Sequence, residues 1–283
     1  MARVKILTDS TAYLPQEYVD QYGIEVIPLT LNWNGNSYRD GVDIKADEFY
    51  TKLKGSDTLP TTNAISIHTY TESIQKALDE GFEVLILPIS SGISASYFNA
   101  VKALETFKGK PVDLFDTQLV SMALSFMVLT AARTAEKGGT LAEVKQAALD
   151  TYPHIGVYFT VATLKYLHKG GRIGGAKRLL GSALSIKPIL QIRDGKIEAS
   201  GSAVTRKKAL ERLMKLVSDG IGDLRPIRIS VFHALDLSTA QDLMERCKKE
   251  FNPLEIILSE VSPVVGSHVG PGTVSIAWMA GVQ

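Results

Sequence analysis

Residues 83–97 of this 283-residue chain are Glu83-Val84-Leu85-Ile86-Leu87-Pro88-Ile89-Ser90-Ser91-Gly92-Ile93-Ser94-Ala95-Ser96-Tyr97. The first seven residues are almost wholly apolar, which is typical of a strand that is buried on both faces of a parallel sheet. A serine-rich turn follows directly, and we expect a helix from there to about residue 107. A strand that passes through a short turn into a helix is the repeating unit of α/β proteins.

The same alternation of strands and helices extends in both directions along the chain. Before residue 83 we expect strands at 3–8 and 25–31, and helices at 16–22, 45–54 and 68–80. Between 112 and 152 we expect a strand at 112–116, a helix at 119–136 and a helix that begins at Thr140, where Glu143 completes a capping box. After residue 153 we expect strands at 155–162, 228–232, 255–258 and 273–279, a hairpin at 187–198, and helices at 206–218 and 237–251.

After Tyr152-Pro153 the composition changes to a segment rich in β-branched and aromatic residues, and this change predicts a domain boundary. The chain is long enough for two α/β domains, and no repeat or low-complexity linker interrupts it. We therefore predict an α/β protein with an N-terminal α/β domain at 1–152 and a C-terminal α/β domain at 153–283. A ligand cleft is expected between the two, because α/β proteins place ligands at domain junctions and at the carboxyl ends of strands.

The composition limits the partners of the protein. Charged residues make up 22% of the chain and the formal net charge is +1, so there is no electrostatic reason to expect nucleic acid or a membrane surface as the main partner. A single cysteine favours a reducing compartment, and the N-terminus enters a strand pattern without a signal-peptide core. The longest apolar stretch, 119–132, is too short to span a bilayer. We expect a cytoplasmic protein that is not an integral membrane protein.

Three segments that we expect to be loops offer hydroxyl or imidazole groups next to a predicted strand end or helix start. They are 59–66, with Thr62 and Ser66; 90–97, with Ser91, Gly92 and Ser94; and 265–273, with Ser267 and His268 between glycines. Helix N-termini attract anions, and histidine suits binding or proton transfer near neutral pH. Ordinary helix capping is the alternative for the two serine- and threonine-rich segments. A hydrogen-bonded structural histidine is the alternative for the third.

Motifs of common enzyme classes are absent from the sequence. The five histidines lack metal-ligand spacing, no Gly-x-Ser-x-Gly surrounds any serine, and no Walker A sequence is present. We therefore expect neither metal nor cofactor and predict that the chain is not an enzyme. The rival hypothesis is a serine hydrolase or transferase in which Ser94 and His268 act on a small acyl or phosphorylated metabolite in the interdomain cleft.

Six segments carry a resemblance that covers nearly the whole chain. They are Thr8-Asp9-Ser10-Thr11-Ala12-Tyr13-Leu14-Pro15, Asp40-Gly41-Val42-Asp43-Ile44, the serine-rich turn at 90–97, Leu164-Lys165-Tyr166-Leu167-His168-Lys169-Gly170-Gly171-Arg172-Ile173, Ser185-Ile186-Lys187-Pro188-Ile189-Leu190 and Gly266-Ser267-His268-Val269-Gly270-Pro271-Gly272. Together they resemble the DegV family of bacterial fatty-acid-binding proteins, which serve as binding subunits of fatty acid kinase. Such a resemblance implies a DegV-like fold with a long-chain fatty acid in a buried apolar tunnel.

The resemblance also implies roles for individual residues. Thr62, Ser94 and His268 match the groups that hold the carboxylate, and we add their neighbours Ser66, Ser91, Gly92 and Ser267 as candidate ligand-binding residues. Arg172 matches an arginine near the head group or the kinase-facing surface. The fatty acid would be a ligand rather than a cofactor.

The partner implied by the resemblance is a separate ATP-dependent kinase subunit, which would phosphorylate the bound fatty acid to an acyl phosphate. Val204 stands where the family often has an arginine, so we expect weak or selective coupling to that kinase. Delivery of a lipid also allows transient contact with a membrane. About 0.8 kcal/mol per buried methylene lets a chain of ~16 carbons contribute roughly 10 kcal/mol before the costs of association.

Overall fold

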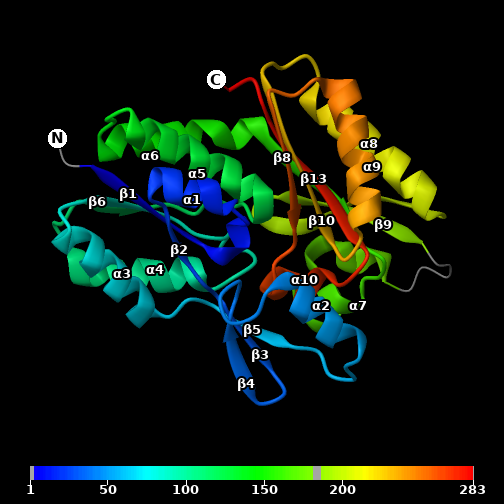
Figure 1. The fold of residues 1–283 in the computed structure, drawn as a ribbon, viewed down its shortest axis with the longest axis horizontal. Coiled ribbons are helices and arrows are strands. Elements are labelled where there is room, and N and C mark those ends of the chain that lie inside the picture. The colour runs from blue at the N-terminus through cyan, green and yellow to red at the C-terminus, as the bar shows by residue number, and fades with distance from the viewer. Residues whose placement is uncertain (1–2, 181–185, 283) are drawn as a thin grey trace.

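The structure is a computed structural model that describes residues 3–180 and 186–282, and it is a mixed α/β fold with three sheets (Figure 1). The first sheet has the strand order β2-β1-β6-β7 and is parallel throughout. Its strands are β1 (Val4–Asp9), β2 (Glu25–Ile27), β6 (Glu83–Leu87) and β7 (Val112–Leu114). The apolar run that begins at residue 83 is the central strand β6, as its composition predicts.

Helices cover both faces of the parallel sheet (Figure 1). On one face lie α3 (Ile67–Asp79) and α4 (Ser96–Leu104); on the other lie α1 (Gln16–Tyr22), α5 (Ser121–Glu136) and α6 (Leu141–Thr151). The capping box that opens α6 is confirmed, since Thr140 and Glu143 each bond the other's backbone N–H. Helix α5 is buried almost along its whole length because it also packs against the second sheet.

The second sheet has six strands in the order β10-β9-β8-β13-β11-β12. They are β8 (Ile155–Thr160), β9 (Lys187–Arg193), β10 (Lys196–Ala203), β11 (Ile227–Ala234), β12 (Glu255–Glu260) and β13 (Thr273–Ala280). Helices α8 (Arg206–Ile221) and α9 (Leu237–Phe251) cover one face, and α5 packs on the other (Figure 1). Both faces of β11 and β13 are therefore buried.

A small third sheet, in the order β4-β3-β5, projects from the body, and α2 (Ala46–Lys54), α7 (Lys165–Lys169) and α10 (Pro263–Val269) lie beside it (Figure 1). Its strands are β3 (Thr30–Trp33), β4 (Asn36–Arg39) and β5 (Thr61–Asn63). The single strand expected at 25–31 is wrong: the segment divides at Pro28-Leu29 into β2 and β3, which belong to different sheets. Proline lacks the N–H that an uninterrupted ladder needs.

Two segments expected as loops contain regular structure. Strand β5 lies within 59–66 and forms because it pairs with β3, a long-range contact that local sequence does not reveal. Helix α10 includes the histidine of the glycine-rich segment; it begins at Pro263, and proline favours the first turn of a helix. A glycine is needed at position 266 within this helix, because a Cβ there would lie 2.4 Å from the Tyr50 hydroxyl oxygen.

The largest hydrophobic core is shared by the two halves of the chain. It joins residues of the parallel sheet, such as Leu7 and Leu85, to residues of the six-stranded sheet, such as Phe159 and Phe232. A second core lies under α8 and α9 and belongs to the C-terminal half alone. The parallel sheet and the six-stranded sheet come from opposite sides of residue 152, but the boundary at 152/153 itself stays a prediction.

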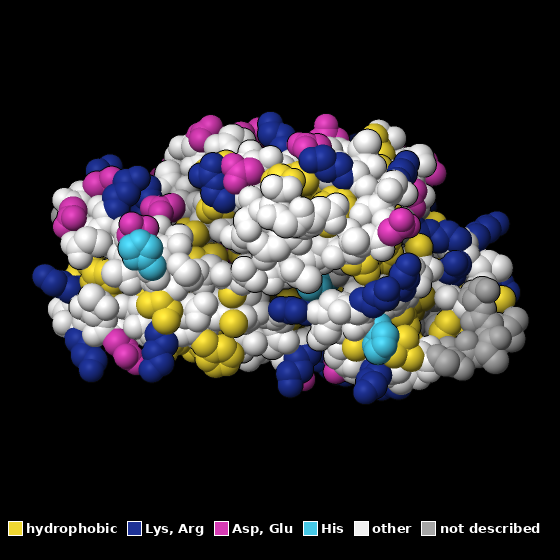
Figure 2. All heavy atoms as spheres, turned by 90° about the horizontal axis from the view of Figure 1, so that it is seen from below, with side chains coloured by type: hydrophobic (Ala, Val, Ile, Leu, Met, Phe, Trp, Pro, Cys, Tyr) yellow, Lys and Arg dark blue, Asp and Glu magenta, His cyan; other side chains and the backbone are white. Residues whose placement is uncertain are grey.

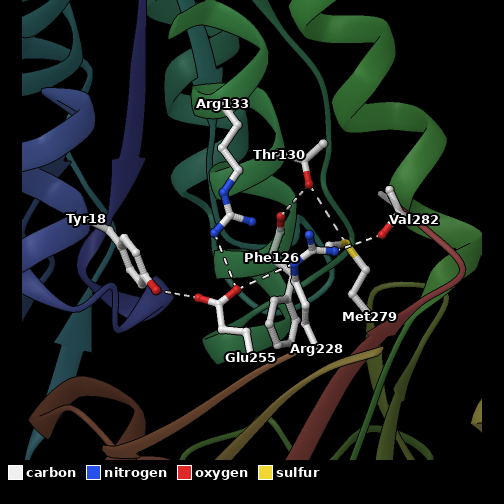
Figure 3. Close-up of polar contacts among 8 residues, drawn as sticks. All are labelled: Tyr18, Phe126, Thr130, Arg133, Arg228, Glu255, Met279 and Val282. Carbon is white, nitrogen blue, oxygen red and sulfur yellow. Dashed lines mark hydrogen bonds and ion pairs between the residues drawn. The ribbon is translucent and has the colours of Figure 1, made fainter. Parts of the chain in front are cut away.

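Glu255 on β12 provides a polar link between the halves (Figure 3). Tyr18 of α1 donates its hydroxyl to Glu255 Oε1 at 2.5 Å, and this hydrogen bond raises the pKa of Tyr18 to about 12. Arg133 of α5 and Arg228 of β11 lie 3.4 and 3.5 Å from Glu255 Oε2. One carboxylate thus ties two N-terminal helices to the edge of the six-stranded sheet.

Candidate functional site

An apolar cavity lies where the two halves of the chain meet. Its volume is about 790 Å³ when the open space at its mouth is included. One wall comes from the six-stranded sheet and includes Val157, Phe159, Ile192, Ile197 and Phe232. The other wall comes from loops of the N-terminal half and includes Leu29, Ile89, Ile93 and Val120. Concave apolar spaces of this kind are where small ligands bind.

Four of the residues predicted from the sequence line this cavity: Thr62, Ser94, Arg172 and His268. Arg172 donates to the carbonyl of Ile93, next to Ser94, and its charge acts on His268, so the four lie near one another. The Thr62 hydroxyl oxygen lies 2.9 Å from His268 Nε2. The pairing of β5 with β3 positions Thr62, and the last turn of α10 positions His268. Ser94 follows β6 in the serine-rich turn. The structure thus brings together three segments that lie far apart in sequence.

Hydrogen bonds fix the serine-rich turn against the segment after β5. The hydroxyls of Ser94 and Ser96 are 3.0 Å apart, and Ser96 Oγ accepts the Ile65 N–H at 3.3 Å. The Asn99 side chain donates to the Ile65 carbonyl at 2.7 Å. Because Ile65 lies three residues after Thr62, these bonds fix the position of the Thr62 backbone relative to that of Ser94.

His268 is neutral at neutral pH. Burial, with a smaller contribution from the nearby charge of Arg172, lowers the pKa of His268 to about 4. Its Nδ1 atom is buried and has no hydrogen-bond partner among the described residues. The ring packs against Gly170, where a Cβ would lie 2.2 Å from Nδ1. A glycine at position 170 is therefore what allows the imidazole to occupy this place.

Asp40 anchors the helix that carries His268. Its carboxylate accepts the Val264 N–H at 3.1 Å, at the start of α10, and the Ser10 hydroxyl at 2.7 Å. Burial raises the pKa of Asp40 to about 6, and the hydrogen bonds it accepts oppose that shift. The sequence analysis noted the segment that begins at Asp40 only for its resemblance to the family and did not predict this role.

Arg172 lies at the mouth of the cavity. Its Nε donates to the Ile93 carbonyl at 3.1 Å, and its Nη1 donates to the Gly170 carbonyl at 2.8 Å. The same residue, with Lys169 and Ser267, lines an outer hollow that adjoins the cavity at Thr62 and His268. Arg172 therefore holds two loops together and also places its charge beside the polar end of the cavity.

The other four predicted residues lie outside the cavity lining. Ser66 accepts the Thr69 N–H and caps α3. Ser91 donates its hydroxyl to Asp116, and Gly92 packs so closely on the hairpin turn that a Cβ would lie 2.5 Å from the Gly195 carbonyl oxygen. Ser267 donates to the Val264 carbonyl within α10 and reaches only the outer hollow. The three serine hydroxyls thus have structural partners, and Gly92 allows close packing of the backbone.

A model of the DegV family matches residues 3–281 of the chain. The chain belongs to the DegV family. A DegV domain-containing protein of Clostridium perfringens is 34% identical over 279 residues, covering 97% of this chain and 98% of the relative. Two solved structures are also similar over nearly their whole length. A DegV family protein of Thermus thermophilus, described by its fatty acid binding, has a TM-score of 0.92 and 33% identity and covers 98% of this chain and 99% of its own.

The second structure is DegV of Bacillus subtilis, described as a fatty acid binding protein. It has a TM-score of 0.90 and 28% identity, and the alignment covers 99% of this chain and all of that one (100%). These comparisons confirm the predicted DegV-like α/β fold.

The site of this DegV family member lacks the geometry of a serine hydrolase. His268 Nε2 faces Thr62, and the Ser94 hydroxyl faces Ser96. No acidic group of the described residues bonds His268 Nδ1, where a hydrolase would place the residue that orients the base. Over residues 3–180 and 186–282, no three His, Cys, Asp or Glu side chains are placed to hold a metal ion. Chemically, the cavity offers hydroxyls, a neutral imidazole and a guanidinium at one end of an apolar space.

Proposed function

We propose that this DegV family member binds a long-chain fatty acid, with the acyl chain in the apolar cavity and the carboxylate beside Thr62, Ser94 and His268. The observation that carries the proposal is the convergence of these three side chains at one end of an apolar cavity. Fatty acid binding by the similar proteins of Thermus thermophilus and Bacillus subtilis supports it.

The carboxylate would be held mainly by hydrogen bonds from hydroxyl groups, and no basic side chain would form a direct ion pair with it. If the His268 Nε2–H donates to the Thr62 oxygen, the Thr62 hydroxyl hydrogen remains free for a carboxylate oxygen. Ser94 supplies a second hydroxyl, and hydrogen bonds to a charged acceptor are about twice as strong as those between neutral groups. Arg172 adds a positive charge at the mouth, which offsets part of the cost of removing the carboxylate from water.

In this proposal the chain is a binding subunit, and catalysis belongs to a partner. A separate ATP-dependent kinase would phosphorylate the carboxylate at the mouth of the cavity and produce an acyl phosphate. Support comes from the outer hollow, where Lys169 and Arg172 present cations next to Thr62 and His268. Phosphate groups attract such cations. Val204, the position where the family often has an arginine, is 69% exposed.

We also propose a cytoplasmic location with transient membrane contact. None of the helices within the described ranges is long and apolar enough to cross a bilayer. Phe98 and Val101 of α4 are 56% and 38% exposed. Figure 2 views the side that lies lowest in Figure 1, where hydrophobic and basic side chains lie next to one another at the surface. A surface of this kind suits brief contact with anionic lipids.

Native mass spectrometry of the protein purified from a bacterial host tests the proposed function. We expect a bound mass that corresponds to a common fatty acid, and rebinding of a labelled fatty acid after its removal. A protein that carries no lipid and, once stripped, binds none at micromolar concentration would contradict the proposal.

A further inference from the structure

Two serine side chains line the cavity without hydrogen-bond partners of their own. Ser121 opens α5 and Ser275 lies in the middle of β13; they are 5% and 2% exposed. No hydrogen bond joins either hydroxyl to a side chain or backbone group of residues 3–180 and 186–282. The Thr273 hydroxyl, which also lines the cavity, differs because it donates to backbone carbonyls.

Ser121 and Ser275 lie on the same side of the six-stranded sheet. Alternate residues of a strand share one face, so Ser275 points to the same face as Met279. Met279 contacts Thr130 of α5 at 3.9 Å from its sulfur, which places α5 over this face (Figure 3). Thr130 lies nine positions after Ser121 along α5, and Met279 lies four positions after Ser275 along β13. Each of these two spans is about 13 Å long.

The N-terminal part of α5 lies toward the Ser275 end of β13. Ser125 donates its hydroxyl to the Ala12 carbonyl, next to Tyr13. The Tyr13 ring is 6.1 Å from the Phe232 ring, and Phe232 is the direct neighbour of Ser275 on β11. These contacts place the start of α5 near Ser275, consistent with both serines lining one cavity.

Ser275 lies further along β13 than the polar end of the cavity. The Thr273 hydroxyl bonds the carbonyls of Val269 and Gly270, which directly follow His268. Ser275 is two residues further along β13, or about 7 Å. An acyl chain that starts at Thr62 and His268 therefore reaches Ser275 along its length, beyond the carboxylate.

A plain alkyl chain would cover both hydroxyls and leave them without partners, which is unfavourable. An oxygen on the chain would remove that penalty, because a hydroxyl can donate to one serine and accept from the other. We propose that Ser121 and Ser275 form an inner polar subsite for a hydroxyl group on the acyl chain, so that hydroxy fatty acids are preferred ligands. This inference rests on the proposed binding of fatty acids in the same cavity.

A positional series of ligands tests the subsite. Protein stripped of lipid is titrated with octadecanoic acid and with hydroxyoctadecanoic acids that differ in the position of the hydroxyl. We expect one position to bind about tenfold more tightly than the unsubstituted acid, as two neutral hydrogen bonds allow, and distant positions to bind more weakly than it.

The variants Ser275→Ala and Ser121→Ala should remove this preference, measured as the ratio of the affinities for the hydroxylated and the unsubstituted acid. Ser125→Ala is the matched control, since it also deletes a buried serine hydroxyl of α5 but one that bonds Ala12 outside the cavity lining. Ser121 has a φ of 60°, whereas Ser275 lies in a regular strand, so Ser275→Ala decides the test if Ser121→Ala folds poorly.

Equal affinity for the unsubstituted acid and every hydroxylated isomer would overturn the subsite and leave the proposed function intact. A preference that survives in Ser275→Ala would overturn it as well. If neither kind of acid binds, the proposed function fails together with the subsite.

Discussion

The Thr62 hydroxyl and the His268 Nε2 atom lie 2.9 Å apart, although 206 residues separate them in the chain. Thr62 comes from a short strand of the smallest sheet, and His268 comes from a seven-residue helix that follows the last parallel strand of the largest sheet. Their contact closes the polar end of the cavity across the two halves of the chain. A change in the position of either half would therefore alter the distance between Thr62 and His268.

The double variant Thr62→Ala with Ser94→Ala should weaken fatty acid binding. Each lost hydrogen bond to the charged carboxylate is expected to cost roughly 1–3 kcal/mol. Titration of lipid-free protein with a fluorescent fatty acid measures the change. Thr71→Ala is the matched control, because the Thr71 hydroxyl bonds the Ile67 carbonyl on the exposed side of α3. Unchanged affinity in the double variant would remove Thr62 and Ser94 from the site.

His268 should make the protein less stable as the pH falls from about 6.5 to about 4. Its folded-state pKa of about 4 lies below the ordinary value of 6.5, so in this window the unfolded chain binds the proton more readily than the folded one. The free energy of unfolding therefore decreases as the pH falls, by at most about 3 kcal/mol from this group. Above pH 6.5 the effect disappears, because both states are neutral.

Urea unfolding of the wild type and His268→Gln across pH 4 to 7 measures this contribution as a difference. The comparison is needed because Asp40 acts in the opposite direction: its folded pKa of about 6 lies above 3.8, so its contribution to stability grows as the pH falls. Asp40 is present in both proteins, so its contribution to the free energy of unfolding cancels in the difference between them. Parallel pH profiles for the two proteins would show that His268 does not titrate as we expect.

Gly170→Ala should displace the His268 ring and weaken fatty acid binding while the fold is retained. The added methyl group would lie 2.2 Å from Nδ1, so the imidazole cannot keep its present position beside Thr62. Loss of the histidine contact predicts an affinity about tenfold lower. Isothermal titration and the chemical shifts of the His268 ring measure the two effects.

Gly171→Ala provides the contrast for that prediction. Gly171 has a φ of 71° and no atom within 4 Å of an added Cβ, so alanine there strains the backbone without touching His268. It should lower stability by about 1–2 kcal/mol and leave affinity unchanged. If Gly171→Ala weakens binding as much as Gly170→Ala, contact with the histidine is not the cause.

The sequence predicts elements well where local pattern and tertiary packing agree. The apolar run at β6 and the Thr140–Glu143 capping box are both confirmed. Strand β5 and helix α10 were expected as loops, because one depends on pairing with β3 and the other on the packing of Gly266 against Tyr50. Such contacts join distant segments and leave no local periodicity.

Within the candidate site, resemblance identified residues that the structure brings together, but the residues that line the apolar cavity could not be predicted. Side chains such as Phe159 and Phe232 line it with the same apolar groups that fill a core, so composition does not distinguish the two. Asp40 was missed because its role depends on a hydrogen bond to Val264, 224 residues away.

The last prediction concerns coupling to the proposed kinase. Arg172→Ala should reduce acyl phosphate formation far more than it reduces fatty acid binding. The phosphate product carries more charge and more acceptor oxygens than the carboxylate, so a cation at the mouth favours product over substrate. Some loss of affinity is expected too, since Arg172 holds the Ile93 and Gly170 carbonyls. The variant should also raise the pKa of His268, because the charge of Arg172 lowers it.

Val204→Arg should act in the opposite direction on kinase coupling. Val204 is 69% exposed, so an arginine there is accommodated without disturbing the core, and it restores a cation that the family often has. Acyl phosphate formation with a purified kinase subunit and labelled ATP measures both variants, and Lys207→Ala on the exposed start of α8 is the charge control. The account of this surface is wrong if Arg172→Ala is fully active and the wild type couples as strongly as Val204→Arg. Loss of phosphorylation in proportion to fatty acid affinity would instead place Arg172 in ligand binding alone.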